Sequence, residues 1–203
     1  FTFKSVTGTA DSADLTLKAA SINDVTIAGV ETITITSGGT AANVLGDLVV
    51  ANASTINISG DQNLTITAEV DMADTSVVTA GAIDGTVDAS AMTGALSFTP
   101  NASDNMKITG GSGDDTFAMT SGLDKNDILD GGAGADTVSI NAVADSATID
   151  ASTYSFTNIE TLSVEGATGL AADPTDITIA IDAAGISTLT LVEPQAHADG
   201  DAT

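Results

Sequence analysis

The sequence predicts an all-β protein, an elongated parallel β-solenoid or β-roll built from short strands. Three observations lead to this expectation. Short segments alternate threonine with β-branched or other apolar residues, and Gly, Asn, Asp or Ser separates them. Hydrophobic residues make up 42% of the chain but aromatic ones only 3%, which suits thin, regular strand stacking better than a bulky globular core. Similar segments also recur along the chain, as expected of rungs that need stacked neighbours to bury their faces.

The expected strands follow one another at the spacing typical of a sandwich, barrel or solenoid. They are Leu15–Leu17, Val25–Ile27, Thr32–Thr36, Thr55–Ile58, Leu64–Thr67, Leu96–Phe98, Leu162–Val164, Ile177–Ile181 and Leu189–Val192. No long amphipathic helix is evident, and the best chances for a short helical turn are Ala41–Leu48 and Ala183–Gly185. Two internal sequence similarities support a repeated structural unit. Gly29–Ile35 resembles Asn158–Val164, and Val87–Ser90 resembles both Ile149–Ser152 and Ile181–Ala184.

Two glycine-aspartate nonapeptides are the most specific signal in the chain. Gly110–Ala118 and Gly131–Ser139 both fit the pattern G-G-x-G-x-D-x-U-x, in which U is a large apolar residue. A degenerate copy, Gly122–Asp130, lies between them, and Asn101–Thr109 precedes them with the same length. The U positions predict an inward-facing stripe of Ile108, Phe117, Leu129 and Val138. Successive turns of a β-roll fall on opposite sides, so the turns at Gly110 and Gly131 are expected to stack on one side.

The turn half of each nonapeptide is suited to bind calcium. Glycine reaches backbone angles closed to other residues, and aspartate adds a charged oxygen. Calcium takes six to eight oxygen ligands, for which carbonyls and carboxylates are suitable donors. The expected site comprises Gly110, Gly111, Ser112, Gly113 and Asp115 with Gly131, Gly132, Ala133, Gly134 and Asp136. A poorer site on the other side would use Asp104, Asp124 and Asp127.

Two alternatives stay open at this point. Both strong turns can be tight Gly/Asp turns without metal. Glu31 and Glu160, at matched places before strands, can be calcium ligands, although a structural role is the stronger expectation.

Charge and composition exclude several classes of protein. The formal charge is −24, from 28 acidic residues against four lysines and no arginine, so binding to nucleic acid or directly to anionic lipid is not expected. The high apolar content argues against disorder. There is no cysteine, so bound metal rather than a disulfide is the expected cross-link in an extracellular fold. No apolar run is long enough for a transmembrane helix.

The start of the sequence lacks both Met and a signal peptide, so we expect a piece of a longer or processed polypeptide. Composition divides the chain into a threonine-rich β-region (residues 1–100), a calcium-binding β-roll segment (101–148), further β-rungs (149–192) and a polar tail (193–203). The only histidine, His197, lies in that tail.

Nothing in the sequence supports an enzyme. There is no cysteine nucleophile, and the G-x-S-x-G, P-loop and H-E-x-x-H motifs are absent. Asp114 and Asp115 would repel a phosphate from the glycines at 110–113, and no lysine follows that loop. Paired carboxylates can serve a glycosidase, but here they sit on the glycine turns, and sugar-stacking aromatic residues are scarce.

The nonapeptides resemble the calcium-binding repeats of RTX proteins. The order of elements from about Leu48 to Ile140, with N-I-E-T-L-S-V at Asn158–Val164, is similar to RTX-type bacterial surface-layer proteins such as that of Caulobacter. The resemblance implies type I secretion, origin in a Gram-negative bacterium, folding on external calcium, and self-association into a sheet or fibre at the cell surface. Cell-surface polysaccharide is a further implied partner. With only two full repeats, the alternatives are a stalk segment of a large RTX adhesin and the non-catalytic β-roll of a secreted hydrolase.

Overall fold

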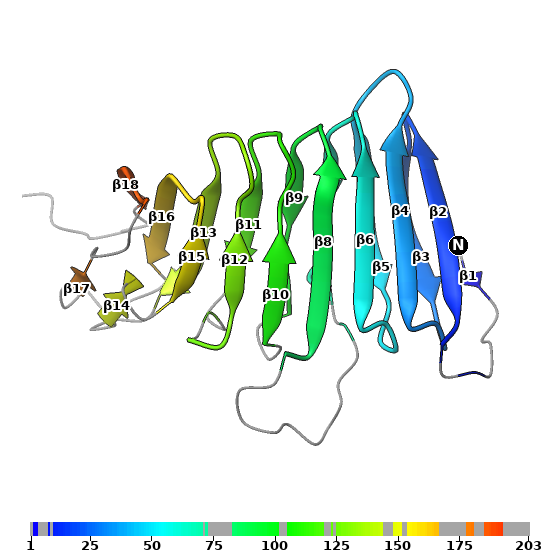
Figure 1. The fold of residues 1–203 in the computed structure, drawn as a ribbon, viewed down its shortest axis with the longest axis horizontal. Helices are drawn as coiled ribbons and strands as arrows, with labels where there is room; N and C mark the ends of the chain where they lie inside the picture. The colour runs from blue at the N-terminus through cyan, green and yellow to red at the C-terminus, as the bar shows by residue number, and fades with distance from the viewer. Residues whose placement is uncertain are drawn as a thin grey trace, which may run out of the picture.

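The alternating threonine and apolar segments form parallel strands that stack side by side along the long axis of the molecule (Figure 1). The computed structural model describes residues 2–3, 8, 10–70, 72, 83–101, 105–119, 123, 125–143, 148–151, 154–166, 178–180 and 185–192. The strands are β1 (Thr2–Phe3), β2 (Ser12–Lys18), β3 (Ser21–Ile27), β4 (Thr32–Gly38), β5 (Asn43–Val49), β6 (Thr55–Gly60), β7 (Leu64–Ile66), β8 (Gly85–Met92), β9 (Leu96–Phe98), β10 (Met106–Thr109), β11 (Thr116–Met119), β12 (Ile128–Asp130), β13 (Thr137–Val143), β14 (Thr148–Asp150), β15 (Ser155–Thr157), β16 (Thr161–Gly166), β17 (Thr178–Ala180) and β18 (Thr188–Val192).

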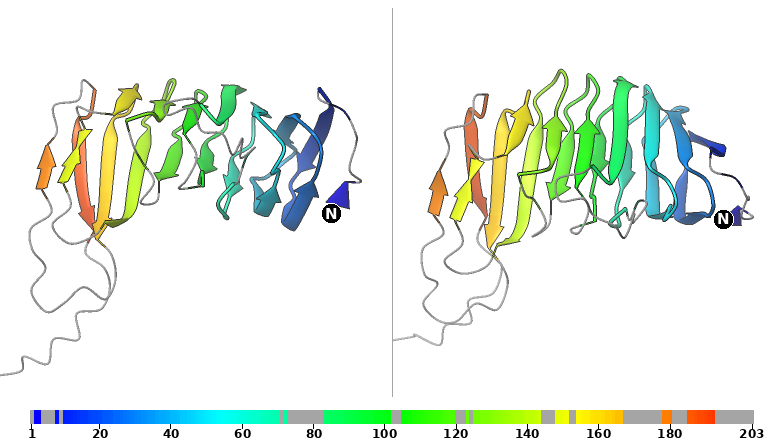
Figure 2. Two further views of the ribbon diagram at one scale, coloured as in Figure 1. Left: turned by 90° about the horizontal axis from the view of Figure 1, so that it is seen from below. Right: turned by 60° about the horizontal axis from the view of Figure 1, so that its bottom comes forward.

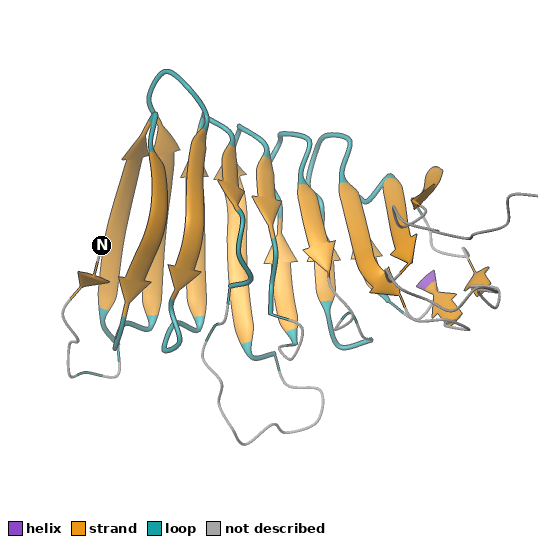
Figure 3. Cartoon of the chain, turned by 180° about the vertical axis from the view of Figure 1, so that it is seen from behind, coloured by secondary structure: helices purple, strands orange, loops and turns teal. Residues whose placement is uncertain are grey.

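Strands next to each other in the sequence mostly belong to opposite sheets, which makes the chain a solenoid (Figures 2 and 3). Sheet A has the order β1-β3-β5-β7-β9-β11-β13-β16-β18, and sheet B the order β15-β12-β10-β8-β6-β4-β2. A small third sheet pairs β14 with β17. All pairings between these strands are parallel, so the strands of successive rungs run in the same direction and lie next to one another. The predicted fold, an elongated parallel β-solenoid, is confirmed.

The core is a set of in-register columns between the two sheets. In sheet B one column runs through Ile33, Ile56, Val87, Ile108 and Leu129, each 0% exposed. In sheet A the facing column contains the 0% exposed residues Phe98, Phe117, Val138 and Leu162. The predicted inward stripe is therefore confirmed, divided between the sheets: Ile108 and Leu129 point inward from sheet B, and Phe117 and Val138 from sheet A.

Most expected strands are found near their predicted positions, but one local prediction is wrong. The helical turn expected at Ala41–Leu48 is replaced by strand β5, which lies between β3 and β7 in sheet A. The backbone N–H groups of Asn43 and Val44 donate to Asn63 and Ala20, at 2.8 and 2.9 Å, so distant partners decide the conformation. Ala183 and Ala184, in the other expected helical turn, lie outside the described residues.

Candidate cation site

The two strong glycine turns stack directly on each other along the edge of sheet A at which strands β11 and β13 begin, as the sequence predicts. Thr116 pairs with Thr137 immediately after the turns, and the N–H of Ala133 donates to the Gly111 carbonyl at 2.9 Å. A Cβ on Gly132 would overlap the Gly111 carbonyl, and one on Gly134 would overlap the Gly113 carbonyl. Glycine is thus required because the two backbones approach closer than a side chain allows.

A ladder of carboxylates runs along this edge, one from each rung. The Leu96 N–H donates to Asp115 Oδ1 at 2.7 Å, and the Asp115 N–H donates to Asp136 Oδ1 at 2.7 Å. The Asp136 N–H then donates to Glu160 Oε2 at 2.8 Å. Each acid directly precedes a strand, and its carboxylate accepts a hydrogen bond from a backbone N–H of the preceding rung. Hydrogen bonds from amides to carboxylates are stronger than neutral ones, so the ladder ties consecutive rungs together.

The second oxygens of the two aspartates differ in their partners. Asp115 and Asp136 are 1% and 0% exposed. Asp115 Oδ2 accepts the Gly111 N–H of its own turn at 2.7 Å. In the second turn the equivalent Gly132 N–H donates instead to Asp130 Oδ1 at 3.1 Å. Asp136 Oδ2 is consequently buried without a hydrogen-bond donor among the described residues.

This environment disfavours the charged form of both aspartates. The pKa of Asp136 is raised to about 6, chiefly by burial; the hydrogen bond from the Asp115 N–H opposes the rise, and the charges of Asp115, Glu160 and Asp114 add to it. Burial likewise raises the pKa of Asp115, which the amides of Leu96 and Gly111 oppose and the charge of Asp114 reinforces. Asp136 is therefore either protonated or, when ionised, in need of a positive charge nearby.

The candidate ligands at these turns, carboxylates and backbone carbonyls, are all oxygens, which a hard cation such as calcium prefers. The unpaired buried Oδ2 of Asp136 is the observation that fits a cation. Among the described residues, however, no group of three or more acidic, His or Cys side chains converges as a metal cluster. Backbone carbonyls of the turn residues Gly110, Gly111, Ser112, Gly113, Gly131, Gly132, Ala133 and Gly134 would have to supply the remaining ligands.

The poorer site of the sequence analysis falls on the other sheet. Asp127, 1% exposed, accepts the Met106 N–H at 2.8 Å through Oδ1, the same inter-rung bond as in the carboxylate ladder. Asp127 directly precedes β12, a strand of sheet B, so it is not brought together with Asp115 and Asp136. Asp104 and Asp124 lie outside the described residues.

Sequence reasoning undervalued Glu160 and missed Asp130. Glu160 continues the ladder although no nonapeptide surrounds it. A local signal existed, because Asp115, Asp136 and Glu160 each precede Thr and then a buried apolar residue. Asp130 has no such signal, since its role is to divert the Gly132 amide and to accept the Asn158 side-chain amide at 2.8 Å.

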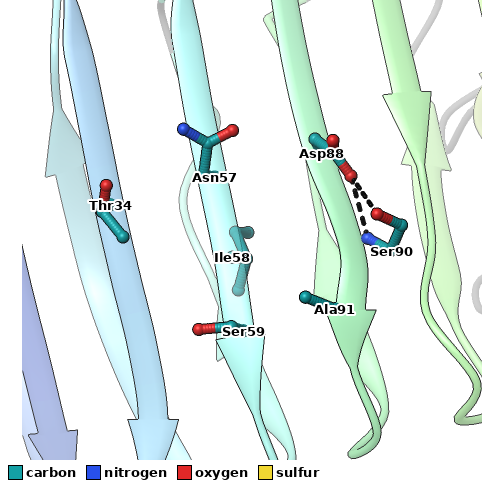
Figure 4. Close-up of a pocket in the computed structure, with 7 residues that line it drawn as sticks. All are labelled: Thr34, Asn57, Ile58, Ser59, Asp88, Ser90 and Ala91. Atoms are coloured by element: carbon teal, nitrogen blue, oxygen red, sulfur yellow. Dashed lines mark hydrogen bonds between the residues drawn. The ribbon is translucent and has the colours of Figure 1, made fainter.

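A shallow depression of about 180 Å³ lies on the outer surface of sheet B (Figure 4). Thr34, Asn57, Ile58, Ser59, Asp88, Ser90 and Ala91 line it. Register shifts between β6 and β8 at this point, after the pair Asn57–Asp88. The side chain and backbone N–H of Ser90 bind Asp88 Oδ1 at 2.6 and 3.0 Å and lower the pKa of Asp88. The carboxylate is thus engaged by its own neighbour, and the depression shows no catalytic constellation.

No model of a known protein family matches the chain, and neither a curated protein nor a solved structure gives a match. Within the described residues, no helix is long and apolar enough to cross a membrane.

Proposed function

We propose that the chain is a structural, calcium-dependent module of a secreted bacterial surface-layer or extracellular fibre protein. The observation that carries the proposal is the buried Oδ2 of Asp136, which no donor among the described residues reaches, in a pair of stacked glycine-aspartate turns. Calcium at these turns would neutralise carboxylates that burial and mutual repulsion disfavour. The resemblance of the nonapeptides to RTX repeats supports the choice of calcium.

The mechanism is coupled binding and folding. Extracellular calcium modules bind with dissociation constants of about 10⁻⁴ to 10⁻³ M, so the ion is bound outside a cell and scarce inside it. With a formal charge of −24, the chain repels itself until cations neutralise part of that charge. Metal binding to the native state then adds to the stability of the stacked rungs. The module is non-catalytic in this proposal.

The decisive experiment is a calcium titration of the metal-stripped chain, followed by circular dichroism and calorimetry, with magnesium as the control ion. We expect calcium, but not magnesium, to increase β-structure and thermal stability. The double variant Asp115→Asn/Asp136→Asn should lose this response, whereas Asp14→Asn/Asp61→Asn, which removes the same charge from two exposed sites, should keep it. A wild-type chain that neither binds calcium nor gains stability from it would overturn the proposal.

Self-association is the second part of the proposal. Strand β18 ends sheet A, and its residues Leu189, Leu191 and Val192 are 39%, 65% and 41% exposed. Leu189 continues the core column of Leu162, so the last rung presents core positions that another rung would cover. Electron microscopy of the calcium-loaded protein should show sheets or filaments. Isolated rods would favour the alternative of a stalk segment in a large adhesin, which the elongated shape also suits.

A further inference from the structure

The hydrogen bonds around Glu31, near the start of the solenoid, repeat those around Glu160. The Asp11 N–H donates to Glu31 Oε2 at 2.7 Å, as the Asp136 N–H donates to Glu160 Oε2 at 2.8 Å. The carbonyl of Asp11 accepts the N–H groups of Glu31 and Thr32 at 3.2 and 3.1 Å. The carbonyl of Asp136 likewise accepts those of Glu160 and Thr161, at 3.1 and 2.9 Å.

The likeness extends to the third rung. The Glu31 carbonyl accepts the N–H groups of Ser54 and Thr55 at 3.0 and 3.2 Å. The Glu160 carbonyl accepts those of Ser187 and Thr188, both at 2.9 Å. The two Asp-Glu pairs nevertheless share no neighbours, because Asp11 and Glu31 precede β2 and β4 of sheet B, whereas Asp136 and Glu160 precede β13 and β16 of sheet A.

Each pair also contains one buried carboxylate oxygen without a hydrogen-bond partner among the described residues. Among the described residues, the buried side-chain oxygens that lack a hydrogen-bond partner are Asp11 Oδ2 and Asp136 Oδ2, each with less than 1 Å² of accessible surface. These atoms belong to the aspartates of the two Asp-Glu pairs. A glycine backbone closes over each atom, since a Cβ on Gly8 would overlap Asp11 Oδ2 and a Cβ on Gly131 would overlap Asp136 Oδ2.

A cation explains this combination better than hydrogen bonding alone. In each pair, the aspartate N–H holds one oxygen of the glutamate, and adjacent rungs are only about 4.8 Å apart, which brings two negative charges together. The remaining aspartate oxygen is removed from water without a donor, an arrangement that costs free energy unless a positive charge is present. Asp11 and Glu31 are half-buried, so an ion can reach them from solvent.

We propose that Asp11 and Glu31 bind a second calcium ion, or another hard divalent cation, at a site outside the glycine-aspartate nonapeptides. The inference rests on the proposed function, because it takes Asp136 to be a calcium ligand and assigns Glu160 to the same ion. The segment Gly8-Thr9-Ala10-Asp11 does not fit the nonapeptide pattern, so the pair was not recognisable as a metal site from its motif. Calcium at this site joins β2, the edge strand of sheet B, to β4.

The test is calcium calorimetry on the metal-stripped full chain, with wild type, Asp11→Asn, Glu31→Gln and Asp136→Asn compared. Asp14→Asn is the matched control, since it removes an exposed charge from β2 without touching the pair. We expect Asp11→Asn and Asp136→Asn each to lower the number of bound ions by about one, and Glu31→Gln to weaken the same site as Asp11→Asn by about 10-fold or more. Asp14→Asn should bind like wild type.

Hydrogen exchange of β2 gives a second readout that does not depend on counting ions. Calcium should slow exchange across Ser12–Lys18 in wild type and in Asp14→Asn, but not in Asp11→Asn. Unchanged stoichiometry and unchanged protection of β2 in Asp11→Asn and Glu31→Gln, in a protein that loses calcium through Asp136→Asn, would overturn this inference and leave the proposed function intact. A wild type that binds no calcium would overturn both.

Discussion

The backbone N–H of Asp115 donates to Oδ1 of Asp136, 2.7 Å away on the next rung. This hydrogen bond gives Asp136 two separate roles. Oδ1 aligns consecutive rungs without any metal, whereas Oδ2 faces the second glycine turn and has no hydrogen-bond donor in the described part of the chain. A cation can therefore use an oxygen that the hydrogen-bonded ladder does not need.

The first prediction concerns pH in the absence of metal. The pKa of Asp136 is raised from 3.8 to about 6 in the folded protein, so the folded state binds more protons than the unfolded state between these values. The contribution of Asp136 to stability therefore falls as pH rises through this window. We expect the melting temperature of metal-stripped protein to decrease from pH 4 to pH 6, and Asp136→Asn to reduce that decrease.

Saturating calcium should reverse this dependence, because the ion competes with the proton for the same carboxylate. Thermal melts at several pH values, with and without calcium, measure both effects. If the metal-free melting temperature rises from pH 4 to pH 6 and Asp136→Asn does not alter the slope, the environment assigned to Asp136 is wrong.

The second prediction concerns the close approach of the two turns. Gly134 has a φ of +141°, and a Cβ there would overlap the Gly113 carbonyl. Gly134→Ala should therefore lower the free energy of unfolding by roughly 1–3 kcal/mol. Gly38→Ala is the matched control, because its Cβ would lie 3.9 Å from its nearest neighbour, the Leu17 carbonyl, and the substitution should change stability by less than about 0.5 kcal/mol. Urea unfolding in calcium compares them, and equal stabilities would contradict the stacked geometry.

The third prediction tests the core column. Phe117 is 0% exposed and pairs in register with Phe98 and Val138. Phe117→Ala should lower the free energy of unfolding by about 3–5 kcal/mol, since it removes a large side chain from a packed interior. Ile128, 38% exposed on the outer side of β12, provides the control, and Ile128→Ala should cost far less. Chemical denaturation of both variants measures the difference, and similar losses would mean that Phe117 is not a core residue.

The sequence predicts the strands and the inward stripe well because both depend on local alternation. Phe117 and Val138 lie at the same place in two copies of one motif, so their shared column follows from the nonapeptide spacing. The helical turn predicted at Ala41–Leu48 failed because pairing of β5 with β3 and β7 outweighs the weak local preference of that segment.

The carboxylate ladder was harder to predict, since it depends on which residues stack across rungs of unequal length. Asp115 and Asp136 are 21 residues apart, but Asp136 and Glu160 are 24 apart. The loops absorb the difference, so no fixed period brings Glu160 into line with the aspartates. The nonapeptide pattern identifies the turns, whereas the inter-rung register identifies the third acid.

The last prediction uses the difference between the two turns. Thr109 pairs with Asp130 in register, and each residue directly precedes a glycine turn. In the turn that follows Thr109, the Gly111 N–H donates to Asp115 Oδ2. In the turn that follows Asp130, the Gly132 N–H donates instead to Asp130 Oδ1. Removing that acceptor should release the Gly132 amide to Asp136 Oδ2. We therefore expect Asp130→Ala to lower the pKa of Asp136 in metal-free protein, as a new hydrogen bond favours the carboxylate.

Asp130→Asn is the control that separates this effect from charge. Both substitutions remove the negative charge of Asp130, but Asn retains an oxygen that can hold the Gly132 amide. Carboxyl NMR titration should thus show a lower pKa of Asp136 in Asp130→Ala than in Asp130→Asn. The same titration in both variants would mean that charge alone matters, and that Asp130 does not keep the second turn open by diverting its amide.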